Sequence, residues 1–404
     1  MAVELNAQSN HYGFRLPDEL VLLRDQIRRF MREEVKPIED KLPHDATGCS
    51  SEDRKKLRAL AEEMGLTRLT VPEEYGGNPV SALARVVISE ESAKCRLGGY
   101  NPALGAFGGG PPNIIWGGTQ DQIERYGIPC IEGKKHAFVA ITEPTGGSDP
   151  RNNISTRATR SGDHWVLNGR KMWITGAGHA DFGIIFARTK DGTENAPPEI
   201  TAFIVEPDFP GINFNEIKVI RALSPYEIVL DNCEVPLENV LGNVGQGFGV
   251  AQNWLVDARI PYAAGCIGIA QEALDMACGW VKQRPTRGGM LADKQAIQWM
   301  IADSEVELRA ARMLIYDAAS KVDEGLPGKV DASICKLYGT ETAGRVVDRA
   351  MQMFGGMGMA QEMPLERWYR EMRVKRIGEG PSEVHRMVIS RDKLRNTDGG
   401  IYFG

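Results

Sequence analysis

The hydrophobic period of the sequence changes twice along the chain, and this change limits the possible folds more than any other feature. Up to about residue 136, and again from about residue 246, apolar residues recur at helical spacing. Between them, short β-branched and aromatic runs alternate with Gly, Asp, Asn and Pro, which is typical of strands and turns. The sequence therefore predicts an α+β multidomain protein. Its parts are an N-terminal α-helical domain (residues 1–136), a central antiparallel β domain built as a sandwich or barrel (137–245), and a C-terminal four-helix bundle (246–404).

The predicted bundle comes from four long helical patterns in the last third of the chain. They cover residues 248–284, 293–325, 330–356 and 381–395. Small residues such as Ala263, Ala264, Gly265 and Gly268 run through the first of them and permit close helix contact. Four such helices, antiparallel to one another, would make a bundle.

Charge and composition exclude several classes of function. The net charge of −6 gives no electrostatic reason to expect nucleic acid or an anionic membrane as a partner. No apolar run is long enough to cross a bilayer, and the first residues lack a signal pattern, so we expect a cytoplasmic protein. The seven cysteines show no Cys-x-x-Cys pair, and no His and Cys spacing predicts a metal site.

Two segments near the start of the β domain carry chemistry. The polar loop "TEPTGGSD" (142–149) can offer backbone N–H groups and the Ser148 hydroxyl to an anionic or carbonyl ligand. In "KMWITG" (171–176), Trp173 and Thr175 lie two residues apart, hence on one face of a strand. Trp173 could cover an aromatic cofactor while Thr175 bonds its polar edge. Taken singly, either segment favours a purely structural interpretation, which for the second is a core tryptophan beside a strand threonine.

The stretch "IGEGPSEVHR" places one acid, Glu379, between two glycines and just ahead of a proline. Pro381 and the residues after it are typical of the first turn of a helix, where positive backbone dipole collects. Glu379 would then stand on a loop that another molecule can approach closely. The alternative is a solvated glutamate in a turn. His385 is a rival base in principle, but it is expected on the surface of the following helix or at an interface.

Four segments in this order resemble landmarks of the acyl-CoA dehydrogenase family of flavoproteins: "TEPTGGSD", "NGRKMWITG", "QMFGGMGM" and "IGEGPSEVHR". The last departs from the commoner Glu-Gly-Thr form, and its Glu-Gly-Pro-Ser-Glu-Val-His motif is similar to a branch with long-chain and unusual-substrate members. The resemblance implies the helix–sheet–helix fold of the family, FAD as cofactor, and a place in acyl-CoA catabolism. The implied reaction is α,β-dehydrogenation of an acyl-CoA thioester to a trans-2-enoyl-CoA.

The resemblance assigns the catalytic base to Glu379, which would take the α-proton while flavin N5 takes the β-hydride. Some members carry the base on a bundle helix, one residue before an arginine. Here Ala258 precedes Arg259 and cannot accept a proton. Gly380 leaves room for the thioester, and the Glu379 N–H could donate to its carbonyl oxygen.

Further roles are implied position by position. The expected flavin contacts are Ile141, Thr142, Ser148, Trp173 and Thr175. The adenine and phosphate side of FAD, partly in a neighbouring subunit, would be met by Arg284, Gln295, Gln352, Gly355, Gly356, Ser382 and Glu383. The expected acyl-CoA contacts are Ser148, Arg259, Gly380 and Arg391, with Asp257 as a possible substitute for an acid that the family often has at position 256.

The family is usually a homotetramer that passes electrons to an electron-transfer flavoprotein, so both are expected partners. An acyl-CoA oxidase, a nitroalkane-oxidase-like flavoenzyme or a non-catalytic relative on the same fold remain alternatives. Many members have a bulky residue where this chain has Gly378. The missing side chain suggests a wider pocket for a branched or ring-bearing acyl group. Residues 100–113 are also expected to reach this pocket.

Overall fold

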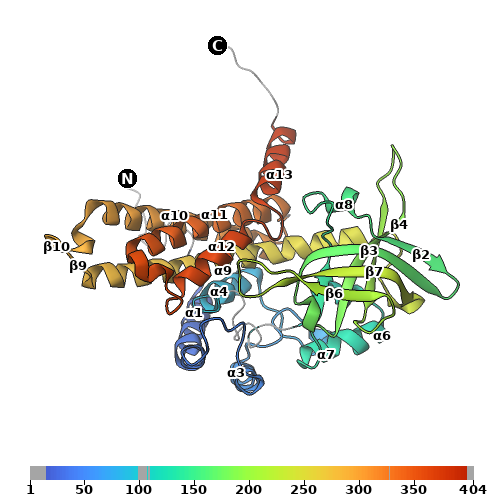
Figure 1. Ribbon diagram of the computed structural model, residues 1–404, viewed down its shortest axis with the longest axis horizontal. Coiled ribbons are helices and arrows are strands. Elements are labelled where there is room, and N and C mark those ends of the chain that lie inside the picture. Colours follow the sequence, from blue (N-terminus) through green and yellow to red (C-terminus); the bar gives the residue numbers. More distant parts are fainter. Residues whose placement is uncertain (1–14, 99–106, 108–109, 327, 398–404) are drawn as a thin grey trace, which may run out of the picture.

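The computed structural model describes residues 15–98, 107, 110–326 and 328–397. Over these residues, helices precede and follow a central sheet, so the predicted helix–sheet–helix order is confirmed. Figure 1 shows the sheet at one end of a long molecule, with the C-terminal helices extending from it to the other end. Of the segment predicted to reach the pocket, residues 100–106, 108 and 109 lie outside the described part.

The N-terminal part is helical because its apolar residues repeat at helical spacing and its helix starts are capped. The helices are α1 (Asp18–Phe30), α2 (Lys36–Glu39), α3 (Ser51–Glu63), α4 (Ala82–Ser92), α6 (Gln120–Gln122) and α7 (Ile128–Ile131). The Ser50 hydroxyl accepts the Asp53 N–H at the start of α3, and Ser81 does the same for Ala84 at the start of α4. Whereas α1 and α3 each bury one face, α4 is buried on most sides.

The central β domain is one hydrogen-bonded sheet of eight strands that curves back on itself, since the rings of Trp165 and Phe203, on strands three places apart in the sheet, pack with centroids 5.5 Å apart. They are β1 (Ala137–Ala140), β2 (Arg157–Ser161), β3 (His164–Thr175), β4 (Phe182–Lys190), β5 (Glu199–Val205), β6 (Ile212–Glu216), β7 (Pro225–Pro236) and β8 (Val240–Leu241). The order is β6-β7-β3-β2-β4-β5-β8, with β1 paired to β4. The short helix α8 (Pro150–Asn153) lies between β1 and β2. Successive β4 residues belong to different cores, Ile184 to one and Ile185 to the other, so apolar groups cover both faces.

The sheet differs from the expected all-antiparallel arrangement at β4. This strand runs parallel to β1 and, at one residue pair, parallel to β2. Parallel pairing needs a long connection, and the chain between β1 and β4 supplies one because it includes the β2–β3 hairpin.

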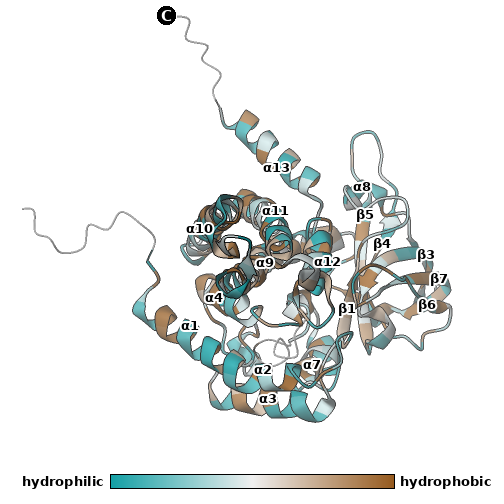
Figure 2. Ribbon diagram, turned by 60° about the vertical axis from the view of Figure 1, so that its left-hand side comes forward, coloured by the Kyte–Doolittle hydropathy of each residue, from teal (hydrophilic) through white to brown (hydrophobic). Residues whose placement is uncertain are grey.

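The bundle is built by three long C-terminal helices together with α4. The C-terminal helices are α9 (Gly247–Gln283), α10 (Gln295–Asp323), α11 (Lys329–Phe354), α12 (Leu365–Lys375) and α13 (Ser382–Arg395), with a small hairpin of β9 (Pro285–Thr286) and β10 (Gly289–Met290) after α9. Figure 2 shows α4, α9, α10 and α11 grouped in cross-section. Buried residues of all four, such as Val86, Ile267, Ile315 and Val346, form one core.

The predicted fourth bundle helix, residues 381–395, corresponds to α13 and lies elsewhere. It projects away from the bundle in both views (Figures 1 and 2). Only Ser382 and His385 of α13 are buried, because the rest of its sequence has no continuous apolar face. The short helix α12, which the sequence pattern did not indicate, packs beside α9 and α11 instead.

None of the helices in the described ranges has the length and apolar character needed to cross a bilayer. Within the same ranges, no three His, Cys, Asp or Glu side chains form a group that could hold a metal ion. All seven cysteines are free thiols, and five of them are buried.

A glycine sets how closely α4 approaches α9. A Cβ at Gly268 would overlap the backbone carbonyl of Glu90. We expect Gly268→Ala to lower the free energy of unfolding by about 1–3 kcal/mol, because overpacking forces the two helices apart. Gly279→Ala is the control on the same helix: a Cβ there meets nothing within 4 Å. It should raise the free energy of unfolding by about 0.5–1 kcal/mol. Urea unfolding measures both, and equal effects would contradict the close packing.

Candidate active site

A buried ion pair joins the "TEPTGGSD" loop to strand β3. Lys171 Nζ lies 2.6 Å from Glu143 Oε1, and the two side chains are 0% and 1% exposed. Lys171 Nζ also donates to the Ile141 carbonyl at 3.2 Å. The segment before the loop and the strand behind it are therefore held together by one lysine.

Each member of this pair is kept in its charged form by the other. Burial lowers the pKa of Lys171 to about 8, against the opposite pull of the Glu143 charge. Burial acts to raise the pKa of Glu143, but Lys171 and hydrogen bonds from Ser155 and Thr156 bring it below its usual value. The carboxylate accepts the Ser155 hydroxyl and the backbone N–H groups of Ser155 and Thr156. All of these bonds fix the shape of the loop.

Next to this pair, a bulge in β3 turns Trp173 outward. The β3–β7 register shifts between Lys171 and Ile174, and Trp173 takes a left-handed backbone conformation with φ 65°. Its indole is 53% exposed, an unusual state for so large an apolar ring. The Met172 N–H donates to the Thr142 carbonyl at 2.9 Å, so Thr142 lies beside Trp173. The structure thus brings Ile141 and Thr142 to the end of β3 that carries Trp173 and Thr175.

Glu379 stands on the loop between α12 and α13, in a backbone conformation that residues other than glycine rarely adopt. Its φ is 57°, and Gly380 follows with φ 97°. Three basic side chains from three helices hold the loop. Arg259 Nε donates to the Glu379 carbonyl at 3.1 Å, His385 Nε2 lies 3.3 Å from the same oxygen, and Lys336 Nζ donates to the Gly380 carbonyl at 2.6 Å. These contacts offset the strain of about 1–3 kcal/mol that such backbone costs.

One oxygen of the Glu379 carboxylate is left without a partner. This atom, Oε2, is buried and makes no hydrogen bond within the described part of the chain. Burial raises the pKa of Glu379, although the positive charges of Arg259, Lys375 and Lys336 act to lower it. A carboxylate that is desolvated, close to cations and free of hydrogen bonds can accept a proton from a bound molecule.

His385 was expected on the helix surface or at an interface, and the surface part of this prediction is wrong. The side chain is 0% exposed and lies beneath the Glu379 loop. Burial, with the charges of Arg259 and Lys336, lowers its pKa to about 4. The imidazole is therefore neutral near pH 7, and Nε2 carries the proton that it donates to the Glu379 carbonyl. It supports the loop and takes no part as a rival base.

Sequence reasoning also missed Lys336. The only signal is a lysine within the apolar run "ASICKLYG" of the helix at 330–356. Lys336 is 0% exposed, and burial lowers its pKa to about 8.

A second group of predicted residues lies at the other end of the molecule. Trp280 near the end of α9 stacks on Phe354 at the end of α11, with ring centroids 5.0 Å apart, and the Arg284 guanidinium lies 5.6 Å from the Trp280 ring. This end is far from β3 in Figure 1. All five predicted residues here are exposed, namely Arg284, Gln295, Gln352, Gly355 and Gly356. One chain therefore does not bring them to Trp173.

Of the remaining predicted contact residues, some bind other side chains of the protein and some are exposed. Asp257 forms an ion pair with Arg85, with bonds of 2.6 and 3.0 Å to its two oxygens. The Ser382 hydroxyl donates to Glu341 at 2.7 Å. Ser148 on the loop and Glu383 and Arg391 on α13 are exposed. Of the predicted acyl-CoA contacts, Arg259 and Gly380 lie at the Glu379 loop.

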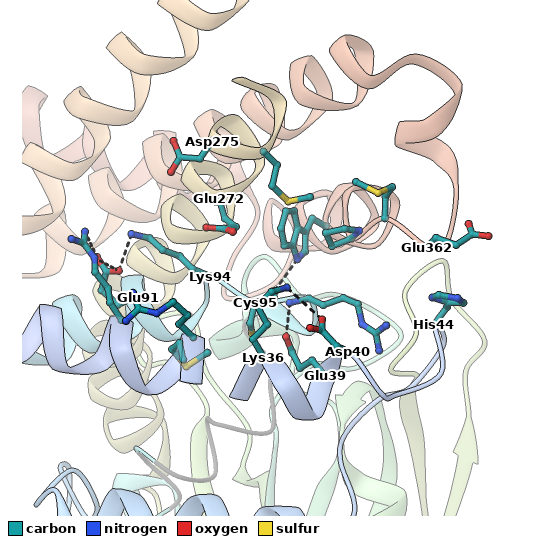
Figure 3. A pocket seen from close by; sticks show the side chains of 18 residues that line it. Lys36, Glu39, Asp40, His44, Glu91, Lys94, Cys95, Glu272, Asp275 and Glu362 are labelled. Carbon is teal, nitrogen blue, oxygen red and sulfur yellow. Dashed lines mark hydrogen bonds and ion pairs between the residues drawn. The ribbon is translucent and has the colours of Figure 1, made fainter. Parts of the chain in front are cut away.

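A cavity of about 800 Å³ lies elsewhere, between α1 and α2 on one side and α9 and α12 on the other. Figure 3 shows charged side chains along it, with Glu91 joined to Lys94 and Glu39 directed at the backbone beside Cys95. None of the predicted site residues lines it. Within its lining, Glu91 pairs with Arg28 and Lys94, and Lys36 pairs with Asp40.

Comparisons with known proteins agree over the whole length of the chain. Three family descriptions match in order: "Acyl-CoA dehydrogenase, N-terminal domain" over residues 17–134, "middle domain" over 138–233 and "C-terminal domain" over 245–394. A short-chain specific acyl-CoA dehydrogenase from Clostridium acetobutylicum is 36% identical, covering 93% of this chain and 98% of its own. The caffeyl-CoA reductase-Etf complex subunit CarC of Acetobacterium woodii is 38% identical, covering 84% of this chain and 90% of its own. The solved structure of butyryl-CoA dehydrogenase from Megasphaera elsdenii has a TM-score of 0.81 at 33% identity, covering 95% of this chain and 100% of that one.

The buried Lys171–Glu143 pair should stabilise the loop strongly. We expect Lys171→Met to lower the free energy of unfolding by about 3–5 kcal/mol, because it leaves an unpaired buried carboxylate. Lys190→Met is the matched control, since Lys190 and its partner Glu199 are 70% and 44% exposed. That change should leave stability nearly unaltered. Urea unfolding of both variants decides. Similar small losses would show that Lys171 does not hold the loop.

Proposed function

This chain belongs to the acyl-CoA dehydrogenase family, and we propose that Glu379 is the base of its reaction. The family makes it an FAD-dependent oxidoreductase of the acyl-CoA dehydrogenase type, with an acyl-CoA thioester as substrate. The observation that supports Glu379 is its carboxylate atom Oε2, which is buried and has no hydrogen-bond partner within the described residues. The loop that carries it is held by three basic side chains.

Each group at the Glu379 loop has its own role in the proposed reaction. Glu379 Oε2 takes the proton from the carbon next to the thioester carbonyl, and the neutral acid that results suits its buried position. The Glu379 N–H donates to the thioester oxygen and stabilises the charge that develops there. Arg259 and His385 hold the carbonyl of the Glu379–Gly380 peptide, and Lys336 holds the carbonyl of the next peptide, so the backbone just after that N–H is fixed on its C-terminal side. FAD, when bound, supplies the acceptor for the hydride from the β-carbon.

The residues present fit an FAD in two parts. At the sheet edge, an exposed indole held in a strained conformation offers a flat surface for the ring system, with Thr142, Ser148 and Thr175 as polar neighbours. At the far end of the bundle, Arg284 suits a pyrophosphate, and the exposed amides of Gln295 and Gln352 suit the adenine side. Ile141 completes the ring side, while Ser382 and Glu383 border the adenosine half.

We propose that the two parts meet across two copies of the chain, because one copy keeps them at opposite ends (Figure 1). Large apolar side chains are exposed around the far end, including Met290, Trp299, Val306, Met357 and Met359. Surfaces of this kind mark contacts between proteins. A homotetramer, as is usual in the family, covers them.

An electron-transfer flavoprotein is the electron partner that we propose. A relative of this chain is named as a subunit of a reductase-Etf complex, which supports this partner. The same relative is named a reductase, and the proposed geometry accommodates both directions, since a base that removes the proton in one direction returns it in the other. We place the protein in the cytoplasm, as the sequence predicts.

Replacement of Glu379 tests the base directly. We expect Glu379→Gln to keep FAD and to bind acyl-CoA, but to slow anaerobic bleaching of the flavin by about 10²–10⁴-fold, because the amide cannot take the proton. In the parent protein the bleaching rate should fall as the pH drops through the raised pKa of Glu379, since only the carboxylate form is active. Stopped-flow absorbance with butyryl-CoA measures both.

Glu324→Gln, at the exposed end of α10, is the control and should bleach at the parent rate. If Glu379→Gln also bleaches at the parent rate, Glu379 is not the base.

Mixed oligomers test the contribution from a second copy. We expect Arg284→Glu alone to lose FAD and Glu379→Gln alone to be inactive. When the two variants are co-expressed with different tags and purified through both tags, the mixed oligomer should be active. In it, the Arg284→Glu chain supplies an intact Glu379, and the Glu379→Gln chain supplies the intact Arg284 for the same site. Acyl-CoA-dependent reduction of a dye measures the recovery.

If Arg284 served the site of its own chain, the mixed oligomer would combine two defective sites and stay as inactive as its parents. That result would overturn the cross-copy arrangement.

A further inference from the structure

The space beside Gly378 is filled by a residue from another helix. A Cβ built on Gly378 would lie 3.3 Å from Tyr262 Oη and 3.8 Å from the Val374 carbonyl oxygen, with no other described heavy atom within 4 Å apart from its chain neighbours. The sequence had suggested that the missing side chain widens the pocket. The structure instead places a phenol there, supplied by α9.

Tyr262 is directed at the Glu379 loop by its position in α9. It follows Arg259 by three residues, and residues at that spacing share one face of a helix. Arg259 on this face donates to the Glu379 carbonyl. Tyr262 therefore lies beside the residue that precedes the proposed base, within one helical turn of a side chain that bonds the base's own backbone.

A buried lysine keeps the phenol in place. Lys375 Nζ from α12 lies 4.2 Å from the centroid of the Tyr262 ring, and Lys375 is 6% exposed. A desolvated ammonium over a tyrosine ring is an attractive contact with a defined geometry. The phenol is thus fixed between α9, α12 and the loop, and is not free to swing away when a ligand enters.

We infer that Tyr262 is a specificity-determining residue of this enzyme and restricts its acyl group to chains without bulk near the reacting bond. This inference rests on the proposed role of Glu379. An acyl thioester that presents its α-carbon to Glu379 also brings the next carbons close to residue 378. A branch or ring on these carbons would need the volume that the Tyr262 side chain occupies. Straight-chain thioesters need no such volume and are the substrate class that the geometry favours.

We assign the selection to the volume of the whole side chain, whose hydroxyl oxygen is the one Tyr262 atom within 4 Å of a Cβ at 378. Tyr262→Phe keeps the ring and should therefore keep the substrate range. Tyr262→Val removes the ring, and Tyr262→Leu is a second variant that keeps more of the apolar packing. In the double variant Tyr262→Val with Gly378→Tyr, the phenol returns to the same space from the loop, because Tyr262 supplies the nearest atom to a Cβ at 378.

The experiment compares kcat/KM for butyryl-CoA with that for 2-methylbutyryl-CoA and 3-phenylpropionyl-CoA, using anaerobic dye reduction. We expect the ratio of bulky to straight substrate to rise at least about tenfold in Tyr262→Val and Tyr262→Leu, the usual value of a methylene-sized change in a pocket. It should stay at the parent ratio in Tyr262→Phe and return toward it in the double variant. FAD absorbance and the melting temperature identify any variant that fails to fold, in which case the other ring-free variant decides.

Failure of the inference and failure of the proposed function look different. If none of the acyl-CoA substrates bleaches the flavin of the parent protein, the proposed function fails. If the parent bleaches with butyryl-CoA but the ratio is unchanged in the ring-free variants, Tyr262 does not set the substrate range. A ratio that shifts equally in Tyr262→Phe would assign the selection to the hydroxyl and overturn the inference as stated.

Discussion

The site depends on holding a carboxylate in a backbone conformation that its own residue type disfavours. Glu379 has a positive φ, and the carbonyls of Glu379 and Gly380 are bound by arginine, histidine and lysine side chains from three helices. These bonds go to backbone carbonyls, and the carboxylate Oε2 has no hydrogen-bond partner within the described residues. The charges of Arg259 and Lys336, together with that of Lys375, limit how far burial raises the pKa of Glu379. Two of the side chains that position the loop therefore also act on the proton affinity of its carboxylate.

The part of the site on the sheet also combines a strained backbone residue with a buried lysine. Trp173 also has a positive φ, and the neighbouring segment is held by Lys171, which is buried and donates to a backbone carbonyl. Lys171 and Lys336 both have a pKa lowered to about 8 by burial. In each half, a buried lysine fixes a backbone segment so that the residue presented to the ligand need not pack into the core. The exposed indole and the unpaired carboxylate are both products of this arrangement.

The sequence is informative where a signal is local and poor where a contact joins distant segments. The order of helices and strands follows from hydrophobic period, and the Glu379 loop before a helix follows from Gly and Pro spacing. The sequence could not predict that α4 completes the bundle core. Its apolar run indicates that α4 is buried, but not which helices it packs against. Lysines are mostly exposed in proteins, so Lys171 and Lys336 gave little signal. The filling of the Gly378 space by Tyr262 required the fold, since the two residues lie on different elements.

The projecting helix α13 begins beside the loop that carries the proposed base. The helix starts at Ser382, two residues after Gly380, and its His385 touches the Glu379 carbonyl. Its 14 residues extend about 21 Å from that point, with little of their surface covered by this chain. A protein that docks on the far part of α13 would therefore hold the same helix whose first turns support the backbone of the proposed base.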